Sequence, residues 1–191
     1  MNCTDYHASG ESFEVWQCQD CGFLLTQDVP VEAEIGKYYD TVDYISHSDT
    51  QRGLTNKLYL LVRKWMLFQK RLLIQRTTSL KKGKLLDIGT GTGYFPYTMK
   101  KAEWQVKAIE KNEKARLFAQ QHFQIDVDHE NVLDHYSDSS YDVITLWHVM
   151  EHIEKINALW ETIHRLLNDR GVLIVAVPNP SSYDARKYQS M

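Results

Sequence analysis

Residues 85–95, LLDIGTGTGYF, place three glycines at every second position directly after a short apolar run that contains an acid. Glycine tolerates positive φ and lets the backbone approach a ligand closely, because it has no Cβ. Gly89, Gly91 and Gly93 therefore predict a ligand-binding loop. The helix expected after this loop would add its own free amides and the positive end of its dipole.

The residues around the loop define the kind of ligand. A dinucleotide fingerprint reads G-x-G-x-x-G, whereas here the third glycine comes two positions after the second and Tyr94 stands where the fingerprint has glycine. Asp87 would repel a pyrophosphate and would favour an ammonium or sulfonium group. Glu110 ends the next expected strand, where a carboxylate can accept both hydroxyls of a ribose. The predicted ligand therefore carries a ribose and a positive charge.

Strand and helix patterns alternate after Gly83 and predict the element that positions each of these residues. The expected strands are 84–88, 105–110, 141–147 and 171–177, with 123–127 a weaker one, and the expected helices are roughly 93–102, 112–122 and 151–167, the last closed by a turn at 168–171. This order predicts an α/β fold with a doubly wound, mostly parallel sheet and helices on both faces. Ligands bind such sheets beyond the carboxyl ends of the strands, where the strand order reverses.

Four sequence blocks together resemble a known family. LLDIGTGTGYF, VKAIEKN, SYDVITLWHVMEHI and LLNDRGVLIVAVPN are similar, in order and spacing, to the class I methyltransferases that use S-adenosylmethionine, and most similar to the ubiquinone-biosynthesis-type branch. The likeness covers about residues 80–180. It implies a Rossmann-like methyltransferase fold, S-adenosylmethionine as cofactor, and an enzyme that methylates a small-molecule acceptor. Oxygen, rather than nitrogen or carbon, is expected as the methylated atom.

The resemblance also assigns the cofactor-binding residues. It places Asp87, Gly89 and Gly91 around the methionine portion of the cofactor and Glu110 on the ribose hydroxyls. The block ENVLD resembles the segment that contacts adenine and nominates Asn131 and Val132. The family often has aspartate at the position of Asn131, but an amide oxygen can also accept from the adenine amino group.

Trp147 and His148 match family positions that face the sulfonium and the methyl acceptor. A plain core aromatic is the alternative for Trp147, and a structural histidine is the alternative for His148. If the acceptor is a hydroxyl that must lose its proton, His148 is the first candidate for a general base. Residues 148–152, HVMEH, also fit the H-x-x-E-H zinc-protease pattern, but that chemistry needs both histidines on one helix, and His148 is expected to end a strand.

Two other functions are alternatives to methyl transfer. The first is a non-catalytic binding or regulatory domain that keeps the cofactor pocket but lacks a complete acceptor site. The second is a nicotinamide-dependent oxidoreductase, which the glycine spacing and Asp87 disfavour.

The first 50 residues are expected to form an appendage. Residues 11–27 suit a short hairpin that turns at 18–22, and Cys18 and Cys21 form half of a zinc ribbon. A tetrahedral site of Cys3, His7, Cys18 and Cys21 is chemically feasible, but the spacing favours a metal-free hairpin. A tyrosine-rich loop at 36–47 follows. Its tyrosines are expected either to cover the site or simply to pack within the loop: Tyr38, Tyr39 and Tyr44.

A linker helix is predicted over 51–82, between the appendage and the methyltransferase core at 83–191. Its apolar residues recur in alternating steps of four and three and predict the buried face: Leu54, Leu58, Leu61, Trp65, Phe68 and Leu72. Its basic residues are expected on a solvated face, with a docking surface as the alternative: Lys57, Arg63, Lys64, Lys70, Arg71 and Arg76.

Composition limits the partners. Lys and Arg number 22 against 25 Asp and Glu, so the net charge of −3 gives no reason to expect nucleic acid or an anionic membrane as partner. No run approaches the roughly 18 apolar residues of a membrane span, and the first residues lack a signal-peptide pattern, so a cytoplasmic location is expected. Three cysteines do not make a disulfide framework.

The C-terminal end departs from the family pattern. The family sheet has two further strands after the one matched by 171–177, whereas residues 178–191 show no strand pattern. The sequence is therefore expected to be a fragment or to have an abbreviated core. An uncovered strand at 171–177 would be a sheet edge, through which self-association is predicted.

Overall fold

The computed structural model describes residues 2–5, 9–30 and 54–188. The chain divides into two compact units, residues 1–50 with 179–191, and residues 51–178. The second unit holds the glycine loop and both candidate acids. His7 and the tyrosine-rich loop at 36–47 lie outside the described residues, so the expectations for them stay untested.

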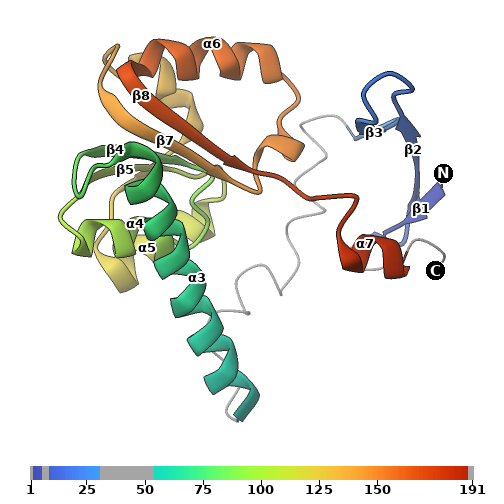
Figure 1. The fold of residues 1–191 in the computed structure, drawn as a ribbon, viewed down its shortest axis with the longest axis horizontal. Helices are drawn as coiled ribbons and strands as arrows, with labels where there is room; N and C mark the ends of the chain where they lie inside the picture. The colour runs from blue at the N-terminus through green and yellow to red at the C-terminus, as the bar shows by residue number, and fades with distance from the viewer. Residues whose placement is uncertain (1, 6–8, 31–53, 189–191) are drawn as a thin grey trace. The chain divides into compact units, whose positions relative to one another are not determined.

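A five-stranded parallel sheet forms the centre of the second unit (Figure 1). Its strands are β4 (Lys84–Ile88), β5 (Gln105–Ile109), β6 (Val127–Asp128), β7 (Tyr141–Trp147) and β8 (Leu167–Ala176). They lie in the order β6-β5-β4-β7-β8. The chain first builds outward from β4 through β5 to β6 and then returns to the other side of β4 with β7. The order therefore reverses between β4 and β7, which confirms the doubly wound α/β fold expected from the sequence.

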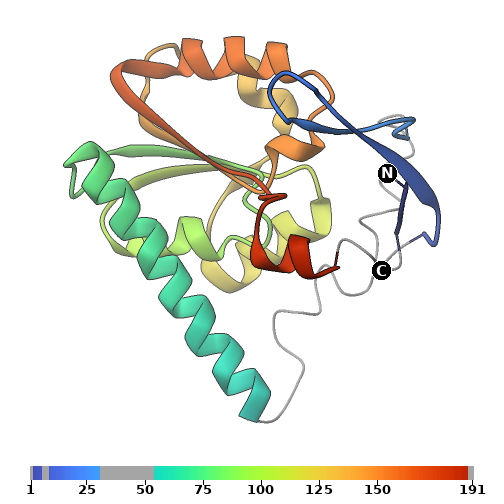
Figure 2. The ribbon, with the colours of Figure 1, turned by 45° about the vertical axis from the view of Figure 1, so that its right-hand side comes forward.

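Helices cover both faces of this sheet (Figure 2). The helix α6 (Ile156–Leu166) packs on one face, while α3 (Leu54–Thr78) and α4 (Tyr94–Lys101) pack on the other. The helix α5 (Glu113–Phe123) follows β5 and lies beside α4. One apolar cluster joins Ile163 and Leu166 to one face of the strands, and a second joins Ile74 and Met99 to the opposite face. Burial of these two clusters on opposite faces fixes which side chains of each strand point toward which helix layer.

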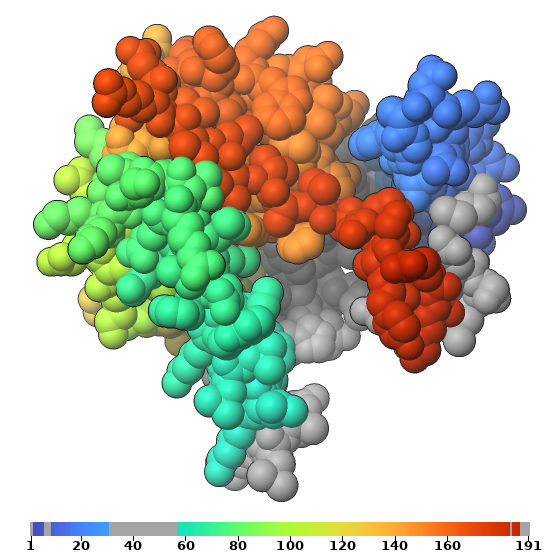
Figure 3. All heavy atoms as spheres, in the orientation of Figure 1, coloured from blue at the N-terminus to red at the C-terminus, as the bar shows by residue number. Residues whose placement is uncertain are grey.

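The helix α3 confirms the expected helix, but the expected buried face is wrong. Leu61 and Trp65 of the apolar stripe are 63% and 58% exposed, whereas Leu67 and Ile74 pack against the sheet. The first half of α3 runs beyond the sheet in Figure 1, and its side chains from residue 57 on stand on the surface in Figure 3. The period of a helix shows that one face is apolar but not which face meets the core.

The expected solvated face of α3 is also wrong in part, because some of its basic residues face the core. The guanidinium of Arg63 lies 3.7 Å from the ring centre of Tyr94, and the ammonium of Lys70 lies 4.4 Å from that of Trp147. Arg63 thus packs on the start of α4 and Lys70 on the end of β7, each with its charge over an aromatic ring. None of the described helices is both long and apolar enough to span a membrane.

The start of β8 differs from the expected one. The turn expected at 168–171 is instead a bulge within β8, because Leu167 pairs with Tyr141 and Val172 with Val143. The side-chain amide of Asn168 donates to Asp142 at 2.7 Å and holds this bulge. Among the described residues, β8 pairs with β7 alone, and self-association through 171–177 stays a prediction.

The helix expected over 151–167 begins only at Ile156. A short 3-10 helix, η2 (Met150–His152), and a loop take up the residues before it. The expected weak strand at 123–127 is likewise displaced, to Val127–Asp128.

The first unit contains the strands β1 (Asn2–Thr4), β2 (Ser12–Gln17) and β3 (Leu24–Thr26) and the helix α7 (Tyr183–Tyr188). The strands β2 and β3 form the expected hairpin with its turn at Cys18–Gly22, closed by the amide of Cys18 donating to the carbonyl of Phe23. Cys3 pairs with Phe13, near the start of β2, and Cys18 follows the end of β2. At about 3.3 Å per residue the strand separates the two cysteines by roughly 16 Å.

Candidate functional site

The glycine loop lies at the point where the strand order reverses. It follows β4 directly and leads into α4, with Gly93 as the N-cap residue at a φ of 84°. The amides of Gly89 and Thr90 both donate to the carbonyl of Ile109, at 2.8 and 2.9 Å. These bonds tie the loop to the end of β5, so the loop is held in place by the neighbouring strand.

The three glycines serve different purposes. A Cβ on Gly89 would collide with the side chain of Val149, and a Cβ on Gly93 would lie 2.7 Å from that of Ala119, so packing requires glycine at both positions. A Cβ on Gly91 would meet no atom within 4 Å, although Gly91 also has a positive φ of 56°. Gly91 therefore borders open space, which is where a bound molecule could approach the backbone.

We expect Gly91→Ala to lower ligand affinity about tenfold or more, because the new Cβ would enter the open space. The left-handed backbone should cost the folded protein only about 1 kcal/mol. Gly10→Ala is the matched control, because Gly10 also has a positive φ with no atom near the Cβ but lies in the first unit. Denaturant unfolding and calorimetric titration with S-adenosylhomocysteine measure the two effects. Equal ligand affinity in the two variants would remove Gly91 from the site.

Glu110 lies beside this open space and is 6% exposed. One carboxylate oxygen accepts from the amide of Gly91 at 2.7 Å, and the other accepts from the amide of Asn112 at 2.9 Å. The guanidinium of Arg116 donates to the backbone carbonyls of Glu110 and Lys111 and fixes the end of the strand. Each carboxylate oxygen has two lone pairs, so Glu110 keeps the capacity to accept from a ligand.

Asp87 lies deeper than the loop. It is 1% exposed, and the hydroxyl of Thr145 on β7 donates to its carboxylate at 2.6 Å. Burial raises the pKa of Asp87 to about 6, against the lowering effect of the Thr145 hydrogen bond and of the Lys70 ammonium. A buried carboxylate of this kind has few compensating charges, so its negative potential favours a cation nearby.

Lys70 is half-buried, whereas the sequence predicts it on a solvated face of α3. Burial lowers the pKa of Lys70, and the carboxylate of Asp87 opposes that effect. Its ammonium lies over the ring of Trp147, which itself packs edge-on against Phe95 of α4 at 5.5 Å between ring centres. A lysine in a helix with five other basic residues gives no signal of burial, because only the packing of α3 selects which of them faces the core.

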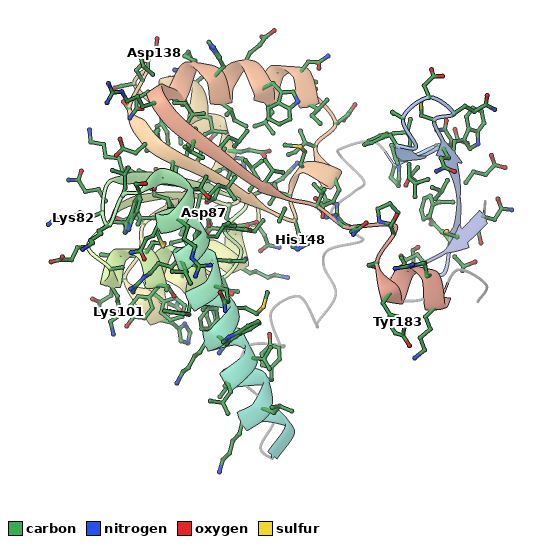
Figure 4. The ribbon with its side chains drawn as sticks, viewed as in Figure 1. Lys82, Asp87, Lys101, Asp138, His148 and Tyr183 are labelled. Atoms are coloured by element: carbon green, nitrogen blue, oxygen red, sulfur yellow. The ribbon has the colours of Figure 1, made fainter. Side chains whose placement is uncertain are left out.

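Trp147 and His148 lie at the carboxyl end of β7, next to the end of β4. His148 has a φ of 58°, and its amide donates to the carbonyl of Ala176 at 2.9 Å. Its imidazole is 63% exposed and lies 3.6 Å from the carboxylate of Glu151. Figure 4 labels His148, which directly follows β7, and Asp87, which lies in β4. A non-glycine residue in the left-handed region is held there by its surroundings and marks a constrained segment.

The backbone of His148 leads to a prediction about stability. We expect His148→Gly to be more stable than His148→Ala by about 1 kcal/mol, because only glycine adopts this φ without strain. Both variants lack the imidazole, so their difference isolates the backbone. Urea unfolding of the two proteins measures it, and equal stability would show that the left-handed conformation carries no cost.

Asn131 and Val132 lie in the short 3-10 helix η1 (Glu130–His135), which follows β6. The side chain of Asn131 is exposed, and Val132 packs against the apolar cluster under α6. The structure thus places them at the carboxyl edge of the sheet on the β5 and β6 side, and Trp147 and His148 on the β7 side.

The zinc-protease alternative finds no geometric support. His148 and His152 are not on one continuous helix, since His148 is in a left-handed turn and His152 ends η2. Within the described ranges, no three His, Cys, Asp or Glu side chains gather closely enough to hold a metal ion. Cys3, Cys18 and Cys21 are all exposed thiols.

The arrangement fits a ligand with a ribose and a positive charge. The open space above Gly91 admits a ligand against the backbone, Glu110 provides acceptors for hydroxyl groups, and buried Asp87 provides a negative potential. Loop, carboxylate and strand end all meet at the reversal point between β4 and β7.

Comparison with known proteins agrees with this geometry. Residues 62–191 match the family described as a methyltransferase domain, which is more than half of the chain. An uncharacterized methyltransferase of Staphylococcus carnosus is 26% identical over 120 residues, which cover 61% of this chain and 56% of that protein.

Two solved structures share the fold. A protein of Pyrococcus horikoshii matches with a TM-score of 0.57 at 17% identity, over 67% of this chain and 60% of its own. A SAM-dependent methyltransferase of Archaeoglobus fulgidus matches with a TM-score of 0.52 at 21% identity, over 65% of this chain and 60% of its own. The chain thus spans somewhat more than half the length of these relatives.

Proposed function

Because the chain belongs to the methyltransferase domain family, whose class I members use S-adenosylmethionine, we propose that it transfers the methyl group of this cofactor to a small-molecule acceptor. The family match agrees with the resemblance in the glycine loop and at the strand ends, and it argues against the nicotinamide-dependent alternative. The proposed acceptor atom is oxygen. Its support is the exposed imidazole of His148, which could take the proton of a hydroxyl group.

We assign the cofactor to the space above Gly91. Glu110 accepts from the ribose hydroxyls, and the methionine portion lies against the loop backbone at Gly91. Asp87 acts from below the loop through its charge, because it is too buried to lie against the ligand in this conformation. Asn131 and Val132 are proposed to border adenine from the β6 side of the site.

The observation that carries the proposal is the pairing of Gly91 with Glu110. The amide of Gly91 donates to Glu110 beside a space in which a Cβ would meet nothing. A loop shaped only by packing would resemble Gly89 and Gly93, where the neighbouring side chains fill the space.

The residues of the chain mainly position and shield the reactants. The cofactor supplies an activated methyl group on a positively charged sulfur. Trp147 forms an apolar wall at the end of β7, and His148 can accept a proton from an acceptor hydroxyl because its imidazole is accessible beside that wall. Holding an acceptor in line can lower the barrier by roughly 7 to 11 kcal/mol.

Incubation with S-adenosylmethionine radiolabelled in its methyl group, together with a panel of phenols, carboxylates and amines, tests the proposal. We expect label in one acceptor class and its loss in His148→Ala if that acceptor is a hydroxyl. Cofactor binding without transfer to any member of the panel would favour a non-catalytic cofactor-binding domain.

A further inference from the structure

A groove with a volume of about 390 Å³ lies between α3 and the ends of β7 and β8. One side comes from α3, and the floor comes from the two strand ends. The lining residues that matter here are Met66, Lys70, Leu73, Arg76, Trp147 and Ala176. All of them belong to the second unit, so the groove is formed within one compact body.

The polar groups of this groove are mainly donors. The Nε1 atom of Trp147 is buried and has no hydrogen-bond partner in the described part of the chain. Lys70 and Arg76 carry positive charge, and the described residues that line the groove include no carboxylate. A buried N–H without a partner is costly, and a ligand acceptor placed there would remove that cost.

Lys70 is able to serve such a ligand. Asp87 interacts with Lys70 through its charge, but that carboxylate is buried and already accepts from Thr145. The ammonium stands over the ring of Trp147, which also lines the groove. Burial lowers the pKa of Lys70, so an anion bound beside the ammonium would stabilise its charged form.

The apolar part of the groove defines the rest of the ligand. Met66, Leu73 and Ala176 offer aliphatic surface, and most of the exposed area inside the groove is apolar. Pockets of this type bind an apolar body and orient it through a few polar groups.

We propose that this groove binds the methyl acceptor, and that the acceptor is an apolar molecule that carries a carboxylate. The carboxylate lies between the Lys70 ammonium and the Trp147 N–H, and the apolar body lies along α3. The inference rests on the proposed methyl transfer, because the groove reaches the end of β7 beside the cofactor loop.

Calorimetric titration of the full chain with naphthoate and with neutral naphthamide tests the proposal without any methyl transfer. We expect naphthoate to bind at least tenfold more tightly than naphthamide. Lys70→Met should remove that preference, and Lys70→Arg should largely keep it. Trp147→Phe should weaken naphthoate binding several-fold, because the ring remains but the N–H is lost.

Lys64→Gln is the matched control, because Lys64 is exposed on the same helix and does not line the groove. Equal binding of acid and amide, or a preference that survives Lys70→Met, would overturn the acceptor assignment. Titration with S-adenosylhomocysteine on the same samples separates the two claims. Cofactor binding without naphthoate binding overturns this inference alone, and naphthoate binding without cofactor binding overturns the proposed function.

Discussion

Asp87→Asn should make the unliganded protein more stable at pH 7.5 and should weaken its binding of S-adenosylhomocysteine. The carboxylate of Asp87 is 1% exposed, and burial raises its pKa from 3.8 to about 6. The folded protein therefore binds this proton more tightly than the unfolded chain does. The free energy of unfolding consequently falls as pH rises from about 4 to about 6 and stays lower above that range.

Asparagine has no charge to bury and still accepts the hydrogen bond from Thr145. We expect a gain on the order of 2 kcal/mol in the free energy of unfolding at pH 7.5. Near pH 4 the gain should vanish, because the wild-type carboxyl is then mostly protonated in the folded protein. Urea unfolding of both proteins at the two pH values measures the difference.

The same substitution removes the negative potential beneath the glycine loop. S-adenosylhomocysteine carries an ammonium group, so we expect its affinity for Asp87→Asn to fall about tenfold or more at pH 7.5. Thr145→Val is a useful companion, because it removes the hydrogen bond while keeping the acid. A variant at Asp87 that is less stable at pH 7.5, or that binds the ligand as tightly as wild type, would contradict this account of Asp87.

Glu110→Ala should reduce both affinity and stability. The carboxylate accepts from the amides of Gly91 and Asn112, so its removal leaves two part-buried donors without their partner. We expect the free energy of unfolding to fall by about 2 kcal/mol. We also expect the dissociation constant of S-adenosylhomocysteine to rise about 5- to 150-fold, since the proposed bonds from the ribose hydroxyls to this charged acceptor would be lost.

Glu113→Ala is the matched control for Glu110. Glu113 begins α5 three residues later, is exposed, and contributes a negative charge at nearly the same edge of the sheet. Its loss should change ligand affinity less than twofold. Calorimetry and urea unfolding on the three proteins give both quantities. Similar losses of affinity in the two variants would point to charge alone rather than to bonds with the ribose.

The fold could be predicted because the strands of a buried parallel sheet are short apolar runs with clear boundaries. The expected strands at 84–88 and 141–147 agree with β4 and β7, and the helices after β4 and β5 begin within one or two residues of their expected starts. The glycine loop could be located because its backbone needs glycine at fixed positions. Glu110 could be located because it directly follows the apolar run of a strand.

The parts that depend on packing could not be predicted. The apolar stripe correctly predicted the helix α3, but the prediction that this stripe is buried is wrong. Leu67 and Ile74 are the residues that meet the sheet. The burial of Lys70 follows from that orientation, and so does the groove beside Trp147. The strand register that places Cys3 opposite Phe13, away from Cys18, likewise has no local signal.

Calorimetric titration of the full chain with S-adenosylhomocysteine, and separately with NAD, tests most directly whether the open space bordered by Gly91 and Glu110 holds the ribose of a positively charged cofactor. We expect that S-adenosylhomocysteine binds, that NAD does not, and that Glu110→Ala weakens the binding of S-adenosylhomocysteine. Binding of NAD alone, or an affinity for S-adenosylhomocysteine that does not depend on Glu110, would contradict this assignment.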